Sequence, residues 1–197
     1  MWIKIKIFPV ILLAESVAGY NKILDFGCGL GLMSYAMKII NPNAEIKGID
    51  IDSRKVMIAK NNISDFNSLE FETGGIEKIK GRYDCILISD VLYINAYDSI
   101  CNILERCYDL LERNGLLIIK EMSKRPAYKY LVNYAQEIFA VNCTGFTKTE
   151  GSAWKKFYIF SENDMGNLLN RMGYTVQSLR VDKGYLYPHI IYKCKKI

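Results

Sequence analysis

Short apolar runs alternate with helix-like segments up to residue 120, and this alternation restricts the fold more than any other feature. Unbroken runs such as Cys85-Ile86-Leu87-Ile88 suit strands that helices cover on both faces. The alternation predicts a parallel sheet with right-handed crossovers. The predicted strands span residues 22–26, 45–50, 69–73, 83–89 and 116–120.

Local signals place the helices and the end of the sheet. Asn41-Pro42 ends a helix over 32–40, Asp52 or Ser53 caps the next one, and Asn114-Gly115 ends an amphipathic helix that begins near Ile100. Later helices are predicted over 128–139 and from Ser161 to Met172, and Ser161-Glu162-Asn163-Asp164 has the capping chemistry that opens the second of them. Two final strands, 174–181 and 189–194, form a hairpin that makes the sheet mixed.

A glycine loop, Gly27-Cys28-Gly29-Leu30-Gly31, follows the first predicted strand. Such a loop lets the backbone turn sharply and approach a ligand closely, but nicotinamide and flavin proteins use a similar one. Asp25 discriminates between ligands, because a carboxylate repels a pyrophosphate and favours the ammonium group of S-adenosylmethionine. The alternative for Asp25 is a strand-end aspartate that bonds nearby backbone groups.

Asp50 ends the second predicted strand, where its carboxylate can accept hydrogen bonds from a ribose diol. This position is common to nucleotide-binding proteins, so it supports an adenosine ligand without choosing among them. Ile51 follows directly and is predicted either to lie against the adenine face or to be a buried core residue.

Three motifs resemble class I S-adenosylmethionine-dependent methyltransferases of the small-metabolite type. They read I-L-D-x-G-C-G-x-G from Ile23, G-I-D-x-D from Gly48 and Y-D-x-I-L-x-S-D-V-L-Y from Tyr83, and they extend over about half of the chain. The resemblance implies a Rossmann-like α/β fold with a seven-stranded mixed sheet, order 3-2-1-4-5-7-6 with strand 7 antiparallel, flanked by helices.

The resemblance also implies roles for individual residues. Asp25 and the loop Gly27, Cys28, Gly29 and Gly31 hold the methionine part of the cofactor, and Asp50 holds the ribose. Ser89 and Asp90 border the methionine part and the reacting centre. Family members have an acidic or polar residue for the adenine amine where this chain has Gly75, so backbone groups could serve there and the recognition of the amine stays open. This departure keeps open a catalytically silent, cofactor-binding partner subunit.

Two residues are candidates for the methyl-acceptor side. If the last strand is antiparallel, His189 begins it at the edge where strands 1, 4 and 5 end, and a histidine there can act as a general base. The alternative is a histidine that completes a loop with a hydrogen bond. Tyr93 is predicted either to line the pocket or to pack in the core.

Several classes of site are disfavoured. None of the six cysteines forms a C-x-x-C pair and there is one histidine, so neither a metal site nor a disulfide framework is predicted. No Asn/Asp-Pro-Pro-Tyr motif follows the fourth strand, which argues against methylation of amines on nucleic-acid bases. These cysteines, and the lack of an apolar run long enough to span a membrane, predict a cytoplasmic protein.

The chain is predicted to form a single domain over residues 1–197. Residues 1–21 form an N-terminal arm or helix, since Pro9 interrupts an apolar run that could otherwise pass for a signal peptide. Residues 22–120 form the cofactor-binding half, 121–160 a small cap for the acceptor, and 161–197 the final helix and hairpin.

The predicted reaction is methyl transfer to a small metabolite that is acidic or bound to a carrier. Residues 121–197 hold 12 Lys+Arg against 6 Asp+Glu, and the cap interleaves lysines with aromatic residues. This composition suits an anionic acceptor, although lysines that only solvate a surface explain it equally well. RNA or protein methylation and nicotinamide oxidoreduction are the alternatives, and no oligomeric state is predicted.

Overall fold

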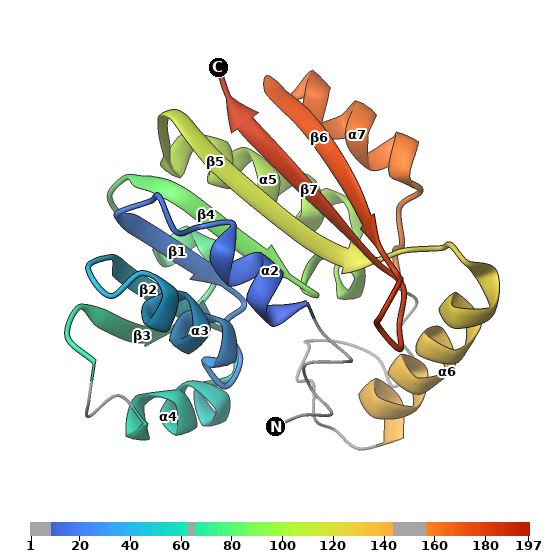
Figure 1. The fold of residues 1–197 in the computed structure, drawn as a ribbon, viewed down its shortest axis with the longest axis horizontal. Helices are drawn as coiled ribbons and strands as arrows, with labels where there is room; N and C mark the ends of the chain where they lie inside the picture. The colour runs from blue at the N-terminus through green and yellow to red at the C-terminus, as the bar shows by residue number, and fades with distance from the viewer. Residues whose placement is uncertain (1–8, 63–65, 144–156) are drawn as a thin grey trace.

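The computed structural model describes residues 9–62, 66–143 and 157–197. They contain a seven-stranded sheet with the order β3-β2-β1-β4-β5-β7-β6 (Figure 1). The first five strands run parallel, and β7 is antiparallel to β5 and β6, which confirms the expected topology. The strands are β1 Lys22–Phe26, β2 Glu45–Asp50, β3 Leu69–Thr73, β4 Tyr83–Ser89, β5 Leu111–Met122, β6 Tyr174–Val181 and β7 His189–Lys196.

Helices cover both faces of the sheet (Figure 1). The apolar side chains of α2, α3 and α4 form a core on one face, and those of α5 and α7 form a core on the other. None of the described helices is long and apolar enough to cross a membrane. The helices are α2 Val10–Glu15, α3 Leu32–Ile40, α4 Ser53–Asn61, α5 Tyr97–Leu110, α6 Ala127–Cys143 and α7 Glu162–Arg171, with short 3-10 turns at η1 Ile76–Lys78 and η2 Leu92–Ile94.

The apolar run in β4 supplies both cores. Ile86 and Ile88 belong to the core under α5, whereas Leu87 belongs to the core under α3, and all three are fully buried. Successive residues of a strand point to opposite faces, so a strand covered on both sides must be apolar throughout. The continuous run predicted from the sequence therefore has a direct structural cause.

Two helices begin at the side-chain caps that the sequence predicts. The Asp52 carboxylate accepts a hydrogen bond from the Arg54 N–H at 3.0 Å at the start of α4. Ser161 Oγ accepts one from the Asp164 N–H at 3.2 Å at the start of α7. Each cap satisfies an amide group that has no partner inside its helix, so it fixes where the helix starts.

The boundary between α5 and β5 corrects the prediction from sequence. The predicted helix extends to Asn114, but β5 already begins at Leu111, which is fully buried and pairs with Tyr83 of β4. Residues 112–115 bulge opposite the single residue Asp84 before regular pairing resumes. Strand pairing by a buried leucine overrides the helical periodicity, and Asn114 sits in the bulge with a left-handed φ of 62°.

The segment after β5, predicted as a cap, is described in part. Helix α6 extends beyond the predicted range of 128–139 at both ends. Tyr93, Tyr134 and Phe157 form a small aromatic cluster that connects η2, α6 and the chain after the gap. Five aromatic and basic residues of the predicted cap lie outside the described residues: Phe146, Lys148, Trp154, Lys155 and Lys156.

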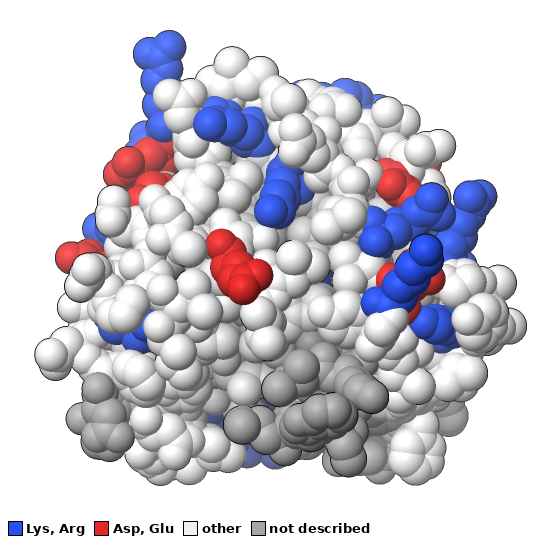
Figure 2. Space-filling model, viewed as in Figure 1, with Lys and Arg blue, Asp and Glu red and all other residues white. Residues whose placement is uncertain are grey.

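Basic side chains gather near the β6–β7 connection. Figure 2 shows Lys and Arg side chains at the right of this face, over that connection and the start of α6. Lys129 of α6 donates hydrogen bonds to the carbonyl oxygens of Asp182 at 2.5 Å and Tyr185 at 2.8 Å. At least this cation therefore has a structural role, because it holds the connection against α6.

Candidate functional site

A cavity of about 330 Å³ lies at the carboxyl ends of β1, β2 and β4. The strand order reverses there, since β1 pairs with β2 on one side and with β4 on the other. Open parallel sheets bind ligands at such a point. The cavity brings together seven of the predicted site residues: Gly27, Gly29, Asp50, Ile51, Gly75, Asp90 and Tyr93.

The glycine loop forms one wall of this cavity. The N–H groups of Gly27 and Cys28 donate to the carbonyl oxygen of Ile49 at 2.8 and 3.0 Å, which ties the loop to β2. Gly27 has a left-handed φ of 78°, and a Cβ built there would lie 2.2 Å from a methyl carbon of Val91. Only glycine fits here, because the backbone must turn and also approach the β4 loop closely.

Asp50 is held rigidly at the end of β2. Its Oδ2 accepts a hydrogen bond from the Gly29 N–H at 2.9 Å, and its Oδ1 accepts one from the Asp52 N–H at 2.8 Å. Carboxylate oxygens have further lone pairs, so both can accept additional donors from a ligand. Ile51 is 58 % exposed and lines the cavity beside Asp50. Its side chain is therefore an exposed apolar surface and not a core residue.

Asp25 lies behind the loop and not in the cavity wall. It is 2 % exposed, and its Oδ2 accepts a hydrogen bond from Ser34 Oγ at 2.5 Å. Burial, together with nearby Asp50, raises the pKa of Asp25 to about 6, while the hydrogen bond from Ser34 opposes this shift. Ser34 partners Asp25 through its hydroxyl and also through its backbone, so a bond to a backbone group, the alternative predicted from sequence, is present as well.

Three further predicted residues lie outside the cavity lining. The Cys28 thiol is buried within the core under α3, and Gly31 precedes that helix with a φ of 81°. Ser89 ends β4, and its buried Oγ has no hydrogen-bond partner among the described residues. Their predicted contacts with the cofactor stay predictions.

Gly75 lines the cavity, as predicted, and an acidic side chain lies next to it. A Cβ built on Gly75 would lie 2.2 Å from an oxygen of the Glu77 carboxylate. Glu77, in the turn η1, also lines the cavity. The carboxylate of Glu77 thus takes the place that a side chain at position 75 would occupy. Sequence analysis missed Glu77, because the motif places the acid two residues earlier.

Asp90 follows β4 in an unusual backbone conformation. Its φ is 55°, a left-handed value that few residues other than glycine adopt. The Asp90 carboxylate accepts a hydrogen bond from the ammonium of Lys120, which is 1 % exposed, and the Asp90 N–H donates to the Lys120 carbonyl at 2.9 Å. Strained residues of this kind occur at functional sites, which fits the position of Asp90 in the cavity wall.

Tyr93 lies at the far end of the cavity in η2. Its hydroxyl donates to a carboxylate oxygen of Glu137 at 2.8 Å, and its ring packs edge-on against Phe157 with centroids 5.3 Å apart. Burial and Glu137 raise the pKa of Tyr93 well above its ordinary value. At neutral pH Tyr93 is therefore a protonated phenol, which suits a lining or hydrogen-bonding role better than that of a base.

His189 lies where the predicted antiparallel strand would put it, opposite Met122 at the end of β5. Its ring is 3 % exposed and stands edge-on to Tyr185, with centroids 5.9 Å apart. His189 is not among the residues that line the cavity at β1, β2 and β4. A role as general base stays a prediction.

Glu121 is a second residue that sequence analysis missed. It follows Lys120 in β5, is 7 % exposed, and bonds to the backbone just beyond Asp90. Nothing in the local sequence marks it, because the residues after β4 that it contacts lie about thirty positions away. Among the described residues, no group of three or more His, Cys, Asp or Glu could hold a metal ion.

Curated proteins of related sequence are methyltransferases. The chain is 27 % identical to trans-aconitate 2-methyltransferase of Deinococcus radiodurans over 135 residues, which are 66 % of this chain and 49 % of that protein. It is 25 % identical to the chloroplastic magnesium protoporphyrin IX methyltransferase of Arabidopsis thaliana over 166 residues, which are 82 % and 48 % of the two proteins. The chain thus spans about half the length of these relatives.

Solved structures share the fold. Magnesium protoporphyrin IX methyltransferase from Synechocystis PCC 6803, with S-adenosylhomocysteine bound, matches with a TM-score of 0.71 and 18 % identity, over 96 % of this chain and 82 % of that one. A 1,6-didemethyltoxoflavin-N1-methyltransferase from Burkholderia thailandensis matches with a TM-score of 0.69 and 16 % identity, over 95 % and 76 %.

A family model described as a methyltransferase domain matches residues 20–172. This range holds the glycine loop, the acidic residues Asp25 and Asp50 of β1 and β2, and the elements α5 and β5 that follow β4. The chain therefore belongs to the methyltransferase-domain family, with the Rossmann-like fold of class I S-adenosylmethionine-dependent methyltransferases.

Proposed function

We propose that the chain binds S-adenosylmethionine in the cavity at β1, β2 and β4 and transfers its methyl group to a small metabolite, free or carrier-bound, that bears an acidic group. The sulfonium of this cofactor is already activated, so the protein mainly has to align the acceptor with the methyl group and exclude water. Relatives that are named for small-molecule substrates support this acceptor class.

The observation that carries the proposal is the acidic lining of the cavity. Four carboxylates line it, those of Asp50, Asp52, Glu77 and Asp90, against the single ammonium of Lys55. Two of these carboxylates form salt bridges, Asp52 with Arg54 and Asp90 with Lys120. Among the described residues, no salt bridge involves Asp50 or Glu77. Such a lining attracts the positively charged sulfonium and ammonium groups and repels the diphosphate of a dinucleotide.

Isothermal titration calorimetry tests the cofactor class. We expect S-adenosylmethionine and S-adenosylhomocysteine to bind at one site per chain, and NAD to give no measurable heat. Binding of NAD instead of the adenosyl ligands would contradict the proposal. Binding without transfer to any member of a panel of small acids, phenols and amines would favour a silent partner subunit. Salt-sensitive binding of RNA would favour the nucleic-acid alternative.

We expect the affinity for S-adenosylhomocysteine to rise about tenfold between pH 5 and pH 7. Asp25 has a pKa of about 6, so about one-tenth of it is ionised at pH 5. The ammonium of the ligand favours the ionised form, and affinity therefore increases as pH rises through 6. Calorimetry at several pH values measures the trend. Asp25→Asn should remove it, and a variant that keeps the full pH dependence would exclude Asp25 as its source.

Glu77 is proposed to accept the hydrogen bond of the adenine amine, because its carboxylate stands at the side-chain position of Gly75. We expect Glu77→Ala to weaken S-adenosylhomocysteine binding about tenfold, as for one hydrogen bond to a charged group. S-inosylhomocysteine, the analogue of S-adenosylhomocysteine without the adenine amine, should bind the variant and the unmodified protein with equal affinity. An equal loss for both ligands would show that Glu77 does not contact the amine.

A further inference from the structure

Glu121 uses only half of its hydrogen-bonding capacity. Its Oε1 accepts hydrogen bonds from the N–H groups of Val91 at 3.2 Å and Leu92 at 2.8 Å. Its Oε2 is buried and has no partner among the described residues. One oxygen thus anchors the carboxyl group to the loop after β4, and the other is oriented and available for a donor.

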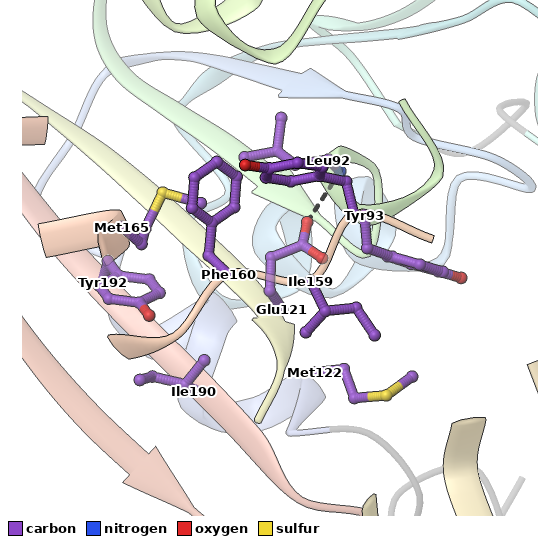
Figure 3. A pocket seen from close by; sticks show the side chains of 10 residues that line it. Leu92, Tyr93, Glu121, Met122, Ile159, Phe160, Met165, Ile190 and Tyr192 are labelled. Atoms are coloured by element: carbon purple, nitrogen blue, oxygen red, sulfur yellow. Dashed lines mark hydrogen bonds between the residues drawn. The ribbon is translucent and has the colours of Figure 1, made fainter. Parts of the chain in front are cut away.

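The space beside Glu121 borders the proposed cofactor cavity. It holds about 10 Å³, enough for a single small polar group, and its other walls are mostly apolar or aromatic, including Leu92, Phe160 and Ile190 (Figure 3). Tyr93 lines both this space and the cofactor cavity. Glu121 therefore lines a space that meets the cofactor cavity at Tyr93.

The charged surroundings disfavour a purely structural role. Burial, helped by Asp90, raises the pKa of Glu121 to about 8, and Lys120 and the two backbone N–H groups only partly offset this. Glu137 stands behind Tyr93, and Tyr158 and Tyr192 are the other phenols that border the space. A glutamine would accept the same two hydrogen bonds without the cost of a buried acid. The acid therefore offers something that an amide cannot, namely a site for a proton.

We propose that Oε2 of Glu121 binds the N–H or O–H group of the methyl acceptor and takes its proton. This inference rests on the proposed function and narrows it, because the accepting atom becomes an amine nitrogen or a hydroxyl oxygen. A carboxylate acceptor has no proton to give and would face a like charge. Any acidic group of the acceptor then lies elsewhere on the molecule.

The step balances in atoms and charge. A lone pair of the acceptor atom forms the new bond to the methyl carbon, the carbon–sulfur bond breaks, and its electron pair stays on sulfur as a neutral thioether. The step starts from the ionised form of Glu121, whose fraction grows as the pH rises through its pKa of about 8. The proton of the acceptor then moves to Oε2, so the carboxylate becomes a carboxylic acid. One positive and one negative charge are thereby neutralised.

Sinefungin tests this inference without a known acceptor, because it carries an amine in place of the methyl that is transferred. We expect Glu121→Gln to bind S-adenosylhomocysteine within twofold of the unmodified protein and sinefungin about tenfold more weakly at pH 8.5. In the unmodified protein, the preference for sinefungin over S-adenosylhomocysteine should rise between pH 6.5 and 9. Glu137→Gln, which alters the half-buried acid that bonds to Tyr93, is the control and should leave this preference unchanged.

The results distinguish a failure of the proposed function from a failure of the inference about Glu121. If the unmodified protein does not bind S-adenosylhomocysteine, the proposed function itself is wrong. If it binds but Glu121→Gln leaves the preference for sinefungin unchanged, Glu121 does not face the acceptor, and this inference is wrong. Thermal unfolding checks that the variant is folded. If it is not, the pH dependence in the unmodified protein decides, and a flat profile overturns the inference.

Discussion

Gly27→Ala is expected to weaken S-adenosylhomocysteine binding at least about 100-fold and to destabilise the protein by about 2 to 4 kcal/mol. The new methyl group would lie 2.2 Å from a carbon of Val91, at a backbone φ of 78° that alanine rarely adopts. Val91 also lines the cavity, so relief of the clash must change the shape of the binding site. Calorimetry measures the affinity, and thermal unfolding should show a loss of roughly 5 to 15 °C.

Gly184→Ala is the matched control. Gly184 has a similar φ of 84°, but no atom lies within 4 Å of a Cβ built there. It lies in the β6–β7 connection and does not line the cofactor cavity. We expect a loss of about 1 kcal/mol from backbone strain alone and unchanged affinity. Equal effects of the two substitutions on affinity would show that the contact with Val91 has no bearing on the ligand.

Asp50→Ala should also weaken S-adenosylhomocysteine binding about 100-fold. The substitution removes the proposed acceptors for the ribose hydroxyls, and two hydrogen bonds to a charged group together amount to about 3 kcal/mol. It also frees the N–H groups of Gly29 and Asp52, which the carboxylate now holds in place. Titration calorimetry measures the loss.

Asp98→Asn serves as its control, because Asp98 is an exposed acid in the first turn of α5 and does not line the cavity. We expect its affinity to equal that of the unmodified protein. An Asp50→Ala protein that bound within threefold of the control would mean that the ribose is held elsewhere, or that the adenosine lies in another orientation.

Much of the fold follows from local sequence. Strands β1 to β4 begin and end where the apolar runs and glycine stops predict, and Asp52 caps α4 as expected. These signals act between near neighbours, so they survive in the folded chain. The start of β5 could not be predicted, because it depends on Leu111 finding Tyr83 in another strand.

The candidate site divides in the same way. Gly27 and Asp50 stand at the ends of the adjacent strands β1 and β2, and a local motif marks each of them in the sequence. The Glu77 carboxylate lies at the side-chain position of Gly75 because of the 3-10 turn η1. Glu121 contacts the loop after β4 because β5 pairs with β4. Such residues emerge from tertiary structure and have no motif of their own.

Strand β7 lies between β5 and β6, although it follows both in the chain. A ribosome therefore releases β5 with an apolar, unpaired edge that stays open until residues 189–196 have been made. Unpaired strand edges readily join other chains, so partly synthesised copies are the ones most exposed to aggregation. Slow translation of the segment between β5 and β7 would lengthen that period, and chaperones that shield strand edges would matter most then.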